Sequence, residues 1–248
     1  MYFKTEGLVL RETQYKDADK LLTVLTKDRG KLTLRARGVR SKNSRLKSGC
    51  QLLAYSEFTV FDNNRFYIVE EAVPIQLFLP LRDDIEKLSL ASYFAQVAEV
   101  LSQEDSPDPG LLSLCLNALY ALSELKKPQE LVKAVFELRA ACQAGYLPML
   151  DGCAICGNPN PDRFLVMAGA VQCAGCLSGE DTGLRLPVHA GALTALRYIS
   201  SCDLKQLFSF QLGEQSLKEL ADIAETYLLA QLERGFFTLD FYKSMKLE

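Results

Sequence analysis

The chain has 248 residues, 48% hydrophobic and 24% charged, which is enough apolar material to fold around a core without disulfides. Its formal net charge is -3, and no apolar run approaches the ~18 residues of a membrane span. The first residues, MYFKTEGLVL, place Lys4 and Glu6 where a signal peptide needs an apolar stretch. We therefore expect a soluble, unexported protein whose eight cysteines stay reduced in the cytoplasm.

The charge is unevenly distributed along the chain. Residues 1–80 carry 14 Lys and Arg against 9 Asp and Glu, a net of +5, whereas residues 81–248 carry 14 against 22, a net of -8. Residues 29–47 contribute eight basic side chains and no acidic one. The sequence therefore predicts a strongly basic local surface on an acidic protein.

Short strands are predicted throughout the first 80 residues. In KLTLRARGV, Leu32, Leu34 and Ala36 alternate with polar and basic residues, which is the period of a strand with one buried face. TEGLVLRET, EFTVF and RFYIVEEAV are further runs of this kind, with turns expected at 27–30 and 62–65. Four or five strands without a long helix between them indicate a small barrel of the OB type, a fold that binds strands of nucleic acid.

Helical periodicity replaces strand periodicity after Pro80. Residues 83–102, 110–125, 129–144 and 214–235 repeat apolar side chains at helical spacing. Asp83 and Asp84 suit a helix start, and Gly145 and Gly235 suit helix ends. The predicted fold class is therefore α+β, with an OB-fold barrel at 1–80 and an α-helical domain at 81–248.

Two CxxC pairs interrupt the helical part. Cys153 and Cys156 are followed, after 16 intervening residues, by Cys173 and Cys176. A single pair could be a redox site, but two pairs at this spacing favour a four-thiolate zinc site, which leaves no position open for a substrate. Because RFLVMAGAVQ resembles a small hairpin, residues 150–182 are predicted to form an inserted zinc-ribbon-like element around one structural zinc ion.

Motifs of common enzyme classes are absent from the sequence. There is no GxxxxGK[ST] phosphate loop, no GxGxxG after a strand and no GxSxG elbow. The only histidine, His189, follows both cysteine pairs and lacks the HxE context of a zinc deaminase, so we expect it at a helix start or on the surface. The remaining thiols, Cys50, Cys115, Cys142 and Cys202, are expected to be buried. These observations favour a binding protein over an enzyme.

The basic stretch RARGVRSKNSRLK has two interpretations. It could be a solvated loop, or it could bind the phosphates of nucleic acid, since it continues the basic face of a strand into a segment rich in Gly, Ser and Asn. Binding of the second kind depends on charge and tolerates any sequence. Tyr2, Phe3, Tyr15 and Tyr55 are candidates for stacking on bases, but each could equally belong to the core.

Three segments in this order resemble the RecO family of bacterial recombination mediators: EGLVLRETQYKDADKLLTVLTKDRGKLTLRARGVR, FELRAACQAGYLPMLDGCAICG and the four-cysteine element. The resemblance covers essentially the whole chain. It implies a non-catalytic, nucleoid-associated role in DNA repair, with binding of single- and double-stranded DNA and annealing of complementary strands. It also implies loading of RecA onto DNA coated by single-strand binding protein, together with RecR and in some pathways RecF.

The resemblance implies site residues as well. The DNA-binding face would comprise Arg29, Lys31, Arg35, Arg37, Arg40, Lys42, Arg45 and Lys47. A pocket of the helical domain would hold the acidic C-terminal tail of single-strand binding protein, with Arg139 as a candidate charge partner. Two other classes stay open: an RNA-binding or transcription-associated module with OB and zinc-ribbon parts, and a protein scaffold whose basic loop binds an acidic partner.

Overall fold

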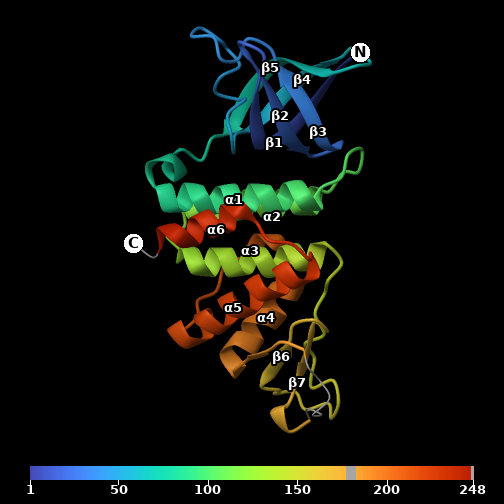
Figure 1. Cartoon of the computed structure of the whole chain (residues 1–248), viewed down its shortest axis with the longest axis vertical. Helices are drawn as coiled ribbons and strands as arrows, with labels where there is room; N and C mark the ends of the chain where they lie inside the picture. The colour runs from blue at the N-terminus through green and yellow to red at the C-terminus, as the bar shows by residue number, and fades with distance from the viewer. Residues whose placement is uncertain (177–182, 247–248) are drawn as a thin grey trace. The chain divides into compact units, whose positions relative to one another are not determined.

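The computed structural model describes residues 1–176 and 183–246 (Figure 1). The chain divides into two compact units, one formed by residues 1–125 with those from 236 onward and the other by residues 126–235. The first unit is therefore discontinuous in sequence. The boundaries predicted at residue 80 and at 150–182 stay predictions, and residues 177–182 lie outside the described part of the chain.

The first unit contains a closed five-stranded barrel, as predicted. Its strands are β1 (Tyr2–Tyr15), β2 (Asp19–Thr26), β3 (Gly30–Ala36), β4 (Tyr55–Asp62) and β5 (Tyr67–Gln76), in the order β1-β2-β3-β5-β4. Neighbours are antiparallel except β3 and β5, which pair in parallel from Leu34 with Tyr67 to Ala36 with Val69. Alternate side chains fill the interior, and Leu22, Val24 and Phe58 have no exposed surface. The period-two prediction of an OB-type barrel is confirmed.

Three helices complete the first unit: α1 (Ile85–Leu101), α2 (Pro109–Ser123) and α6 (Phe237–Met245), with a short 3-10 helix η1 (Leu79–Asp83) before α1. The side chain of Asp84 accepts a hydrogen bond from the Lys87 amide and so caps α1, as its position in the sequence predicts. The late helix α6 packs against α1, where the hydroxyl of Thr238 donates to Gln96 Oε1 at 2.5 Å. Residues from both ends of the sequence thus share one unit.

A close backbone approach joins the barrel to the connection between α1 and α2. Lys31 donates its amide to the Gln103 carbonyl and its ammonium to the Glu99 carbonyl, each at 2.9 Å. Arg11 on β1 pairs with the Glu99 carboxylate at 2.9 Å. Gly30 has a positive φ of 66°, and a Cβ there would lie 2.6 Å from the Gln103 oxygen. Only glycine fits this position.

The second unit consists of α3 (Gln129–Gln143), α4 (Ala190–Ser201) and α5 (Glu214–Gln231), with a three-stranded sheet. The sheet consists of β6 (Arg163–Leu165), β7 (Ala170–Gln172) and β8 (Arg185–Pro187), in the order β7-β6-β8. Two 3-10 helices also belong to this unit: η2 (Ala174–Cys176) follows β7, and η3 (Leu204–Gln206) follows α4. Helix α3 packs on α5 and α4. The predicted helices at 129–144 and 214–235 and the predicted hairpin are confirmed. Helix α6 was not predicted, and α4 was anticipated only through the expectation that His189 stands at a helix start or on the surface. Across the described residues, no helix is both long and apolar enough to span a membrane.

A buried charge cluster ties α3 to α5. The Lys133 ammonium, whose side chain is 7% exposed, lies 2.9 Å from a Glu137 carboxylate oxygen and 2.7 Å from one of Glu225. Burial alone would lower the pKa of Lys133, but the two carboxylates raise it above its ordinary value. The lysine is therefore held in its charged form inside the helical layer.

Replacing Lys133 with Met should lower the free energy of unfolding by about 3 kcal/mol, because the Glu137 carboxylate, with no exposed surface, loses this cation. Urea denaturation followed by circular dichroism measures the change. Lys218→Met, at an exposed position on α5, is the matched control. If both variants unfold within about 0.5 kcal/mol of the original protein, the cluster does not contribute as described.

Candidate nucleic-acid interface and metal centre

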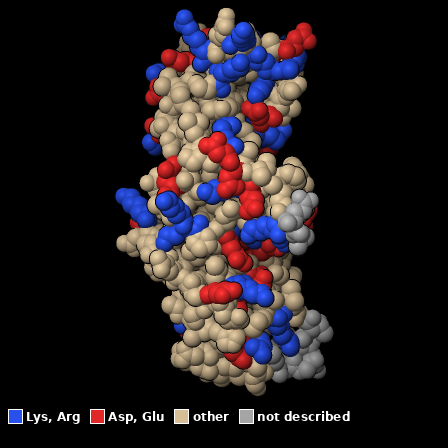
Figure 2. Space-filling view, turned by 90° about the vertical axis from the view of Figure 1, so that its left-hand side faces the viewer, with Lys and Arg blue, Asp and Glu red and all other residues tan. Residues whose placement is uncertain are grey.

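The basic loop, residues 37–54, connects β3 to β4 through consecutive turns. Val39 and Cys50 are buried in the barrel core at 3% and 1% exposure, and Leu46 packs against the same cluster. These apolar contacts attach the basic loop to the barrel core. Figure 2 shows Lys and Arg side chains gathered over the barrel, in the upper part of the view.

Asp19, at the start of β2, holds the beginning of the basic loop. Its Oδ1 accepts the Gly38 amide at 2.8 Å, and its Oδ2 accepts Nε and Nη2 of Arg35 at 2.9 and 2.7 Å. The hydrogen bond from the Gly38 amide, and to a smaller extent the Arg35 guanidinium, keep the pKa of Asp19 below its ordinary value. Arg40 adds a hydrogen bond from Nη1 to the Asp17 carbonyl at 3.1 Å. The first turn of the loop is therefore fixed to the turn that precedes β2.

The eight basic residues of the predicted DNA-binding face fall into two groups. Exposed residues on the basic loop are Arg37, Arg40, Lys42, Arg45 and Lys47. The other three all have side-chain partners within the unit, since Arg35 binds Asp19, Lys31 binds a helix carbonyl, and the exposed Arg29 covers the ring of Phe3 at 4.0 Å from its centroid. Of the five loop cations, Arg40 also donates to the Asp17 carbonyl, but its side chain is exposed like the others. The loop residues are thus the cations most open to phosphates, and the binding role of all eight stays a prediction.

The candidate stacking residues differ in their surroundings. Tyr2 is 62% exposed, whereas Phe3 lies beneath Arg29 and Tyr15 lies 5.2 Å from the Arg35 guanidinium. The hydroxyl of Tyr55 donates to Glu6 at 2.6 Å, and burial together with that carboxylate raises the pKa of Tyr55. Tyr55 is therefore part of the barrel wall.

The four cysteines of the predicted zinc element come together in the second unit. The sulfur atoms of Cys153, Cys156, Cys173 and Cys176 all lie within 4.8 Å of one another. Each CxxC pair forms a tight turn: the Gly157 amide donates to the Cys153 carbonyl, and the Cys176 amide to the Cys173 carbonyl, both at 2.9 Å. Gly157 has a positive φ of 74°, which a tight turn of this kind requires.

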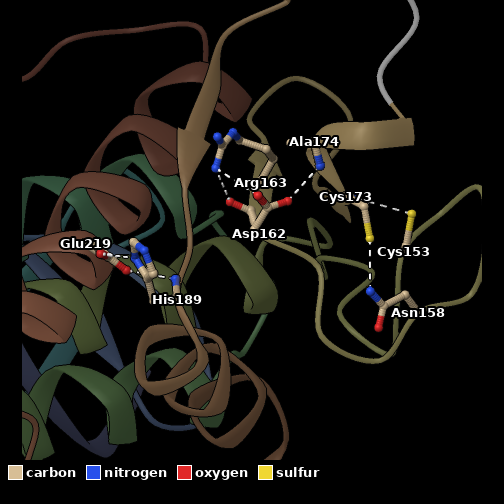
Figure 3. Close-up of polar contacts among 8 residues, drawn as sticks. All are labelled: Cys153, Asn158, Asp162, Arg163, Cys173, Ala174, His189 and Glu219. Atoms are coloured by element: carbon tan, nitrogen blue, oxygen red, sulfur yellow. Dashed lines mark hydrogen bonds and ion pairs between the residues drawn. The ribbon is translucent and has the colours of Figure 1, made fainter.

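Donors from the chain point at the sulfur atoms (Figure 3). The Cys173 amide donates to Cys153 Sγ at 3.3 Å, and Asn158 Nδ2 donates to Cys173 Sγ at 3.2 Å. The amides of Cys156 and Cys173 lower the pKa of Cys153 to about 6, while the neighbouring Cys156 side chain raises that of Cys176 to about 12. Four convergent sulfurs with N–H donors around them fit a soft, tetrahedral metal ion. Asn158 was not predicted as part of this site, although it stands directly after the first CxxCG.

Side chains of the second unit hold this element in place. Arg197 on α4 donates to the main-chain carbonyls of residues 150 and 159, on either side of the first cysteine pair, at 2.8 and 2.7 Å. Asp162 accepts the Ala174 amide at 2.7 Å beside the second pair.

His189 directly precedes α4, as expected. Its amide and its Nδ1 are hydrogen-bonded to the Glu219 carboxylate at 2.9 and 2.5 Å (Figure 3).

The cysteines outside the cluster have buried or partly buried thiols. Cys50 and Cys115 are 1% exposed, and burial raises the pKa of each to about 12. Cys142 and Cys202 are partly buried, and burial raises their pKa values as well. Thiols in such surroundings stay protonated and unreactive.

Arg139, the candidate partner for an acidic tail, lies within the helical layer. Its Nη1 donates to the carbonyls of Ile199 and Ser200, at 2.9 and 2.8 Å, and so caps the last turn of α4. That nitrogen is committed to a structural contact. The contact with a tail stays a prediction.

The fold and the two sites define a protein that carries a basic loop on an OB-type barrel and a four-cysteine cluster on a helical part. Residues 1–78 match the family model "Recombination protein O N terminal", and residues 82–240 match "Recombination protein O C terminal". The chain is 34% identical to the DNA repair protein RecO of Acetivibrio thermocellus, with 98% of this chain and 97% of the relative covered. The corresponding protein of Alkaliphilus metalliredigens is 28% identical, with 99% and 100% covered. The chain belongs to the RecO family of DNA repair proteins.

Replacing Cys153 and Cys156 together with Ser should remove bound metal and loosen the four-cysteine element, because two of four thiolate ligands are lost. Elemental analysis of the purified protein and limited proteolysis measure these effects. Cys202→Ser, outside the cluster, should keep its metal. Equal metal content in all three proteins would contradict the metal site.

Proposed function

We propose that this protein is a recombination mediator that binds single- and double-stranded DNA and anneals complementary strands. It helps load RecA onto DNA coated by single-strand binding protein, together with RecR and, where present, RecF. The observation that carries the proposal is the set of exposed cations on the basic loop, in a chain of the RecO family. Strand annealing and the loading of RecA are both achieved by binding, so the proposed mechanism requires no catalytic group.

The basic loop supports binding that ignores sequence. Its exposed Arg and Lys side chains can meet phosphates, and release of counterions from the DNA then drives association. Because Asp19 and the buried Val39 fix the loop, little conformational freedom is lost on binding. Any sequence offers the same phosphates, so affinity should depend on salt much more than on base composition.

The same cations account for annealing. Two DNA strands repel each other through their phosphates, and a surface that carries several positive charges lowers this repulsion when both strands lie near it. Base complementarity then selects the correct partner, without a contribution from the protein to sequence recognition. Annealing should therefore weaken in parallel with phosphate binding.

The four-cysteine cluster is proposed to hold one zinc ion in a structural role. Four thiolates fill the tetrahedral coordination that zinc prefers, which leaves no position for a reacting water. When bound, the ion supplies a crosslink between the two CxxC turns. The chain contributes the orientation of the sulfurs through Asn158 and the amide of Cys173.

Partners are proposed from family membership. RecR, the acidic C-terminal tail of single-strand binding protein and RecA would be met on the nucleoid in the cytoplasm. Acidic residues outnumber basic ones in residues 81–248, so phosphate binding is assigned to the barrel and protein contacts to the helical part.

Replacing Arg37, Arg40 and Arg45 together with Gln should weaken binding to all DNA sequences alike. The plot of log affinity against log salt should become shallower by about 2 for single strands, at ~0.7 per lost phosphate contact. Fluorescence anisotropy with labelled oligonucleotides measures the slope, and a strand-annealing assay in the same buffer should slow in parallel.

The matched control replaces Lys126, Lys205 and Lys218 with Gln, which changes the net charge equally at exposed positions of the second unit. This control should keep the original slope. Full affinity and an unchanged slope in the loop variant would exclude the basic loop as the DNA surface. Loss in both variants alike would mean that only overall charge matters.

A further inference from the structure

A cavity of about 430 Å³ opens beside the barrel, within the first unit. Its walls are the first half of β3 (31–33), the hairpin between β4 and β5 (62 and 64–67) and residues 104–105 of the connection between α1 and α2. It exists because β3 and β5 pair only from Leu34 and Tyr67 onward, so the earlier part of β3 faces the hairpin across a gap. We call this cavity the hairpin pocket.

Hydrogen bonds between side-chain oxygens and main-chain amides fix the shape of the hairpin. Asn63 Oδ1 accepts the amides of Arg65 and Phe66 at 3.0 and 2.7 Å, and Asp62 Oδ1 accepts the Asn64 amide at 2.8 Å. Asn64 has a positive φ of 65°, which Asn tolerates in turns. The turn is therefore fixed by polar contacts, and Phe66 is left 42% exposed at the pocket wall.

Aromatic rings and cations alternate next to this wall. Tyr67 lines the pocket and meets Phe3 edge to face, with ring centroids 5.7 Å apart. Phe3 in turn lies beneath the Arg29 guanidinium, and Arg65 precedes Phe66 on the hairpin. Aromatic faces interleaved with cations are the arrangement on which unpaired bases stack while their phosphates are neutralised.

The charges that line the pocket favour a base over a phosphate. Asp62, Glu104 and Asp105 line it together with two cations, Lys31 and Arg65, so the lining carries one net negative charge and disfavours a phosphate inside it. The ammonium of Lys31 is turned to the Glu99 carbonyl and does not offset them fully. An uncharged base has no such penalty, and carboxylates can accept hydrogen bonds from the exocyclic amino groups of bases.

We propose that the hairpin pocket binds one unpaired base of single-stranded DNA, with Phe66 as the stacking face and Arg65 on the adjoining phosphate. This proposal rests on the proposed function and adds a distinction between single strands and duplex. A base within a duplex is stacked and paired, so it cannot enter the pocket. The basic loop serves both forms of DNA, and the hairpin pocket serves single strands alone.

The test uses the absence of tryptophan from the chain. Phe66→Trp places a unique fluorophore at the pocket wall and keeps the stacking face. Its emission should be quenched by a mixed-sequence single strand, but not by a single strand of the same length made of abasic sites or by a blunt duplex. Phe66→Ala should lower single-strand affinity roughly tenfold while duplex affinity stays unchanged, since stacking of one base is lost.

Phe237→Ala, at a 73% exposed position on α6 of the same unit, is the matched control and should bind single strands like the original protein. Unchanged single-strand affinity in Phe66→Ala, with affinity lost in the basic-loop variant, would overturn the hairpin pocket and leave the proposed function intact. Equal loss for single strands and duplex in Phe66→Ala would also overturn it. If the unaltered protein binds neither form of DNA, the proposed function itself fails.

Discussion

The carboxylate of Asp19 is the constraint on which the basic surface depends. Five exposed cations within eleven residues repel one another, and a free loop would relieve that repulsion by spreading into solvent. Asp19 pairs with Arg35 at the end of β3 and accepts the Gly38 amide. These contacts fix the course of the chain where it passes from β3 into the basic loop. Burial of Val39 and Cys50 then returns it to the barrel. The exposed cations of the basic loop are held close together because a single acidic group fixes where the loop begins.

The barrel and the four-cysteine element are stabilised by different interactions. The barrel closes on itself, so its apolar interior is shielded and its strands have few free edges. The element around the cysteines has three strands of three residues each, too few to be stable alone. It relies on Arg197 from α4, on the buried Phe164 and on the convergence of four thiols. A metal ion at that point would replace the apolar core that so short a segment cannot supply.

Local patterns were sufficient for much of the fold and of the site. The period-two runs predicted the barrel strands, the helical runs predicted α1, α2, α3 and α5, and the CxxC spacing predicted which four thiols converge. Contacts between distant residues were not accessible in this way. Arg35 has the same place in the pattern as Arg37, and only the approach of Asp19, 16 residues earlier, separates a structural cation from an exposed one. Phe66 was indistinguishable from a core residue of β5, because its exposure follows from the hairpin bonds of Asn63.

The position of α6 has a consequence for how the protein is made. Its contacts with α1 join residues 142 positions apart, and the whole of the second unit, residues 126–235, lies between them in the sequence. During synthesis the ribosome therefore completes the second unit before it delivers the helix that finishes the first. Until then, the face of α1 that later meets α6 is open, and Tyr93, which packs against Phe236, lacks that neighbour. The unit that carries the basic surface thus reaches its final form only after nearly the entire sequence has been translated.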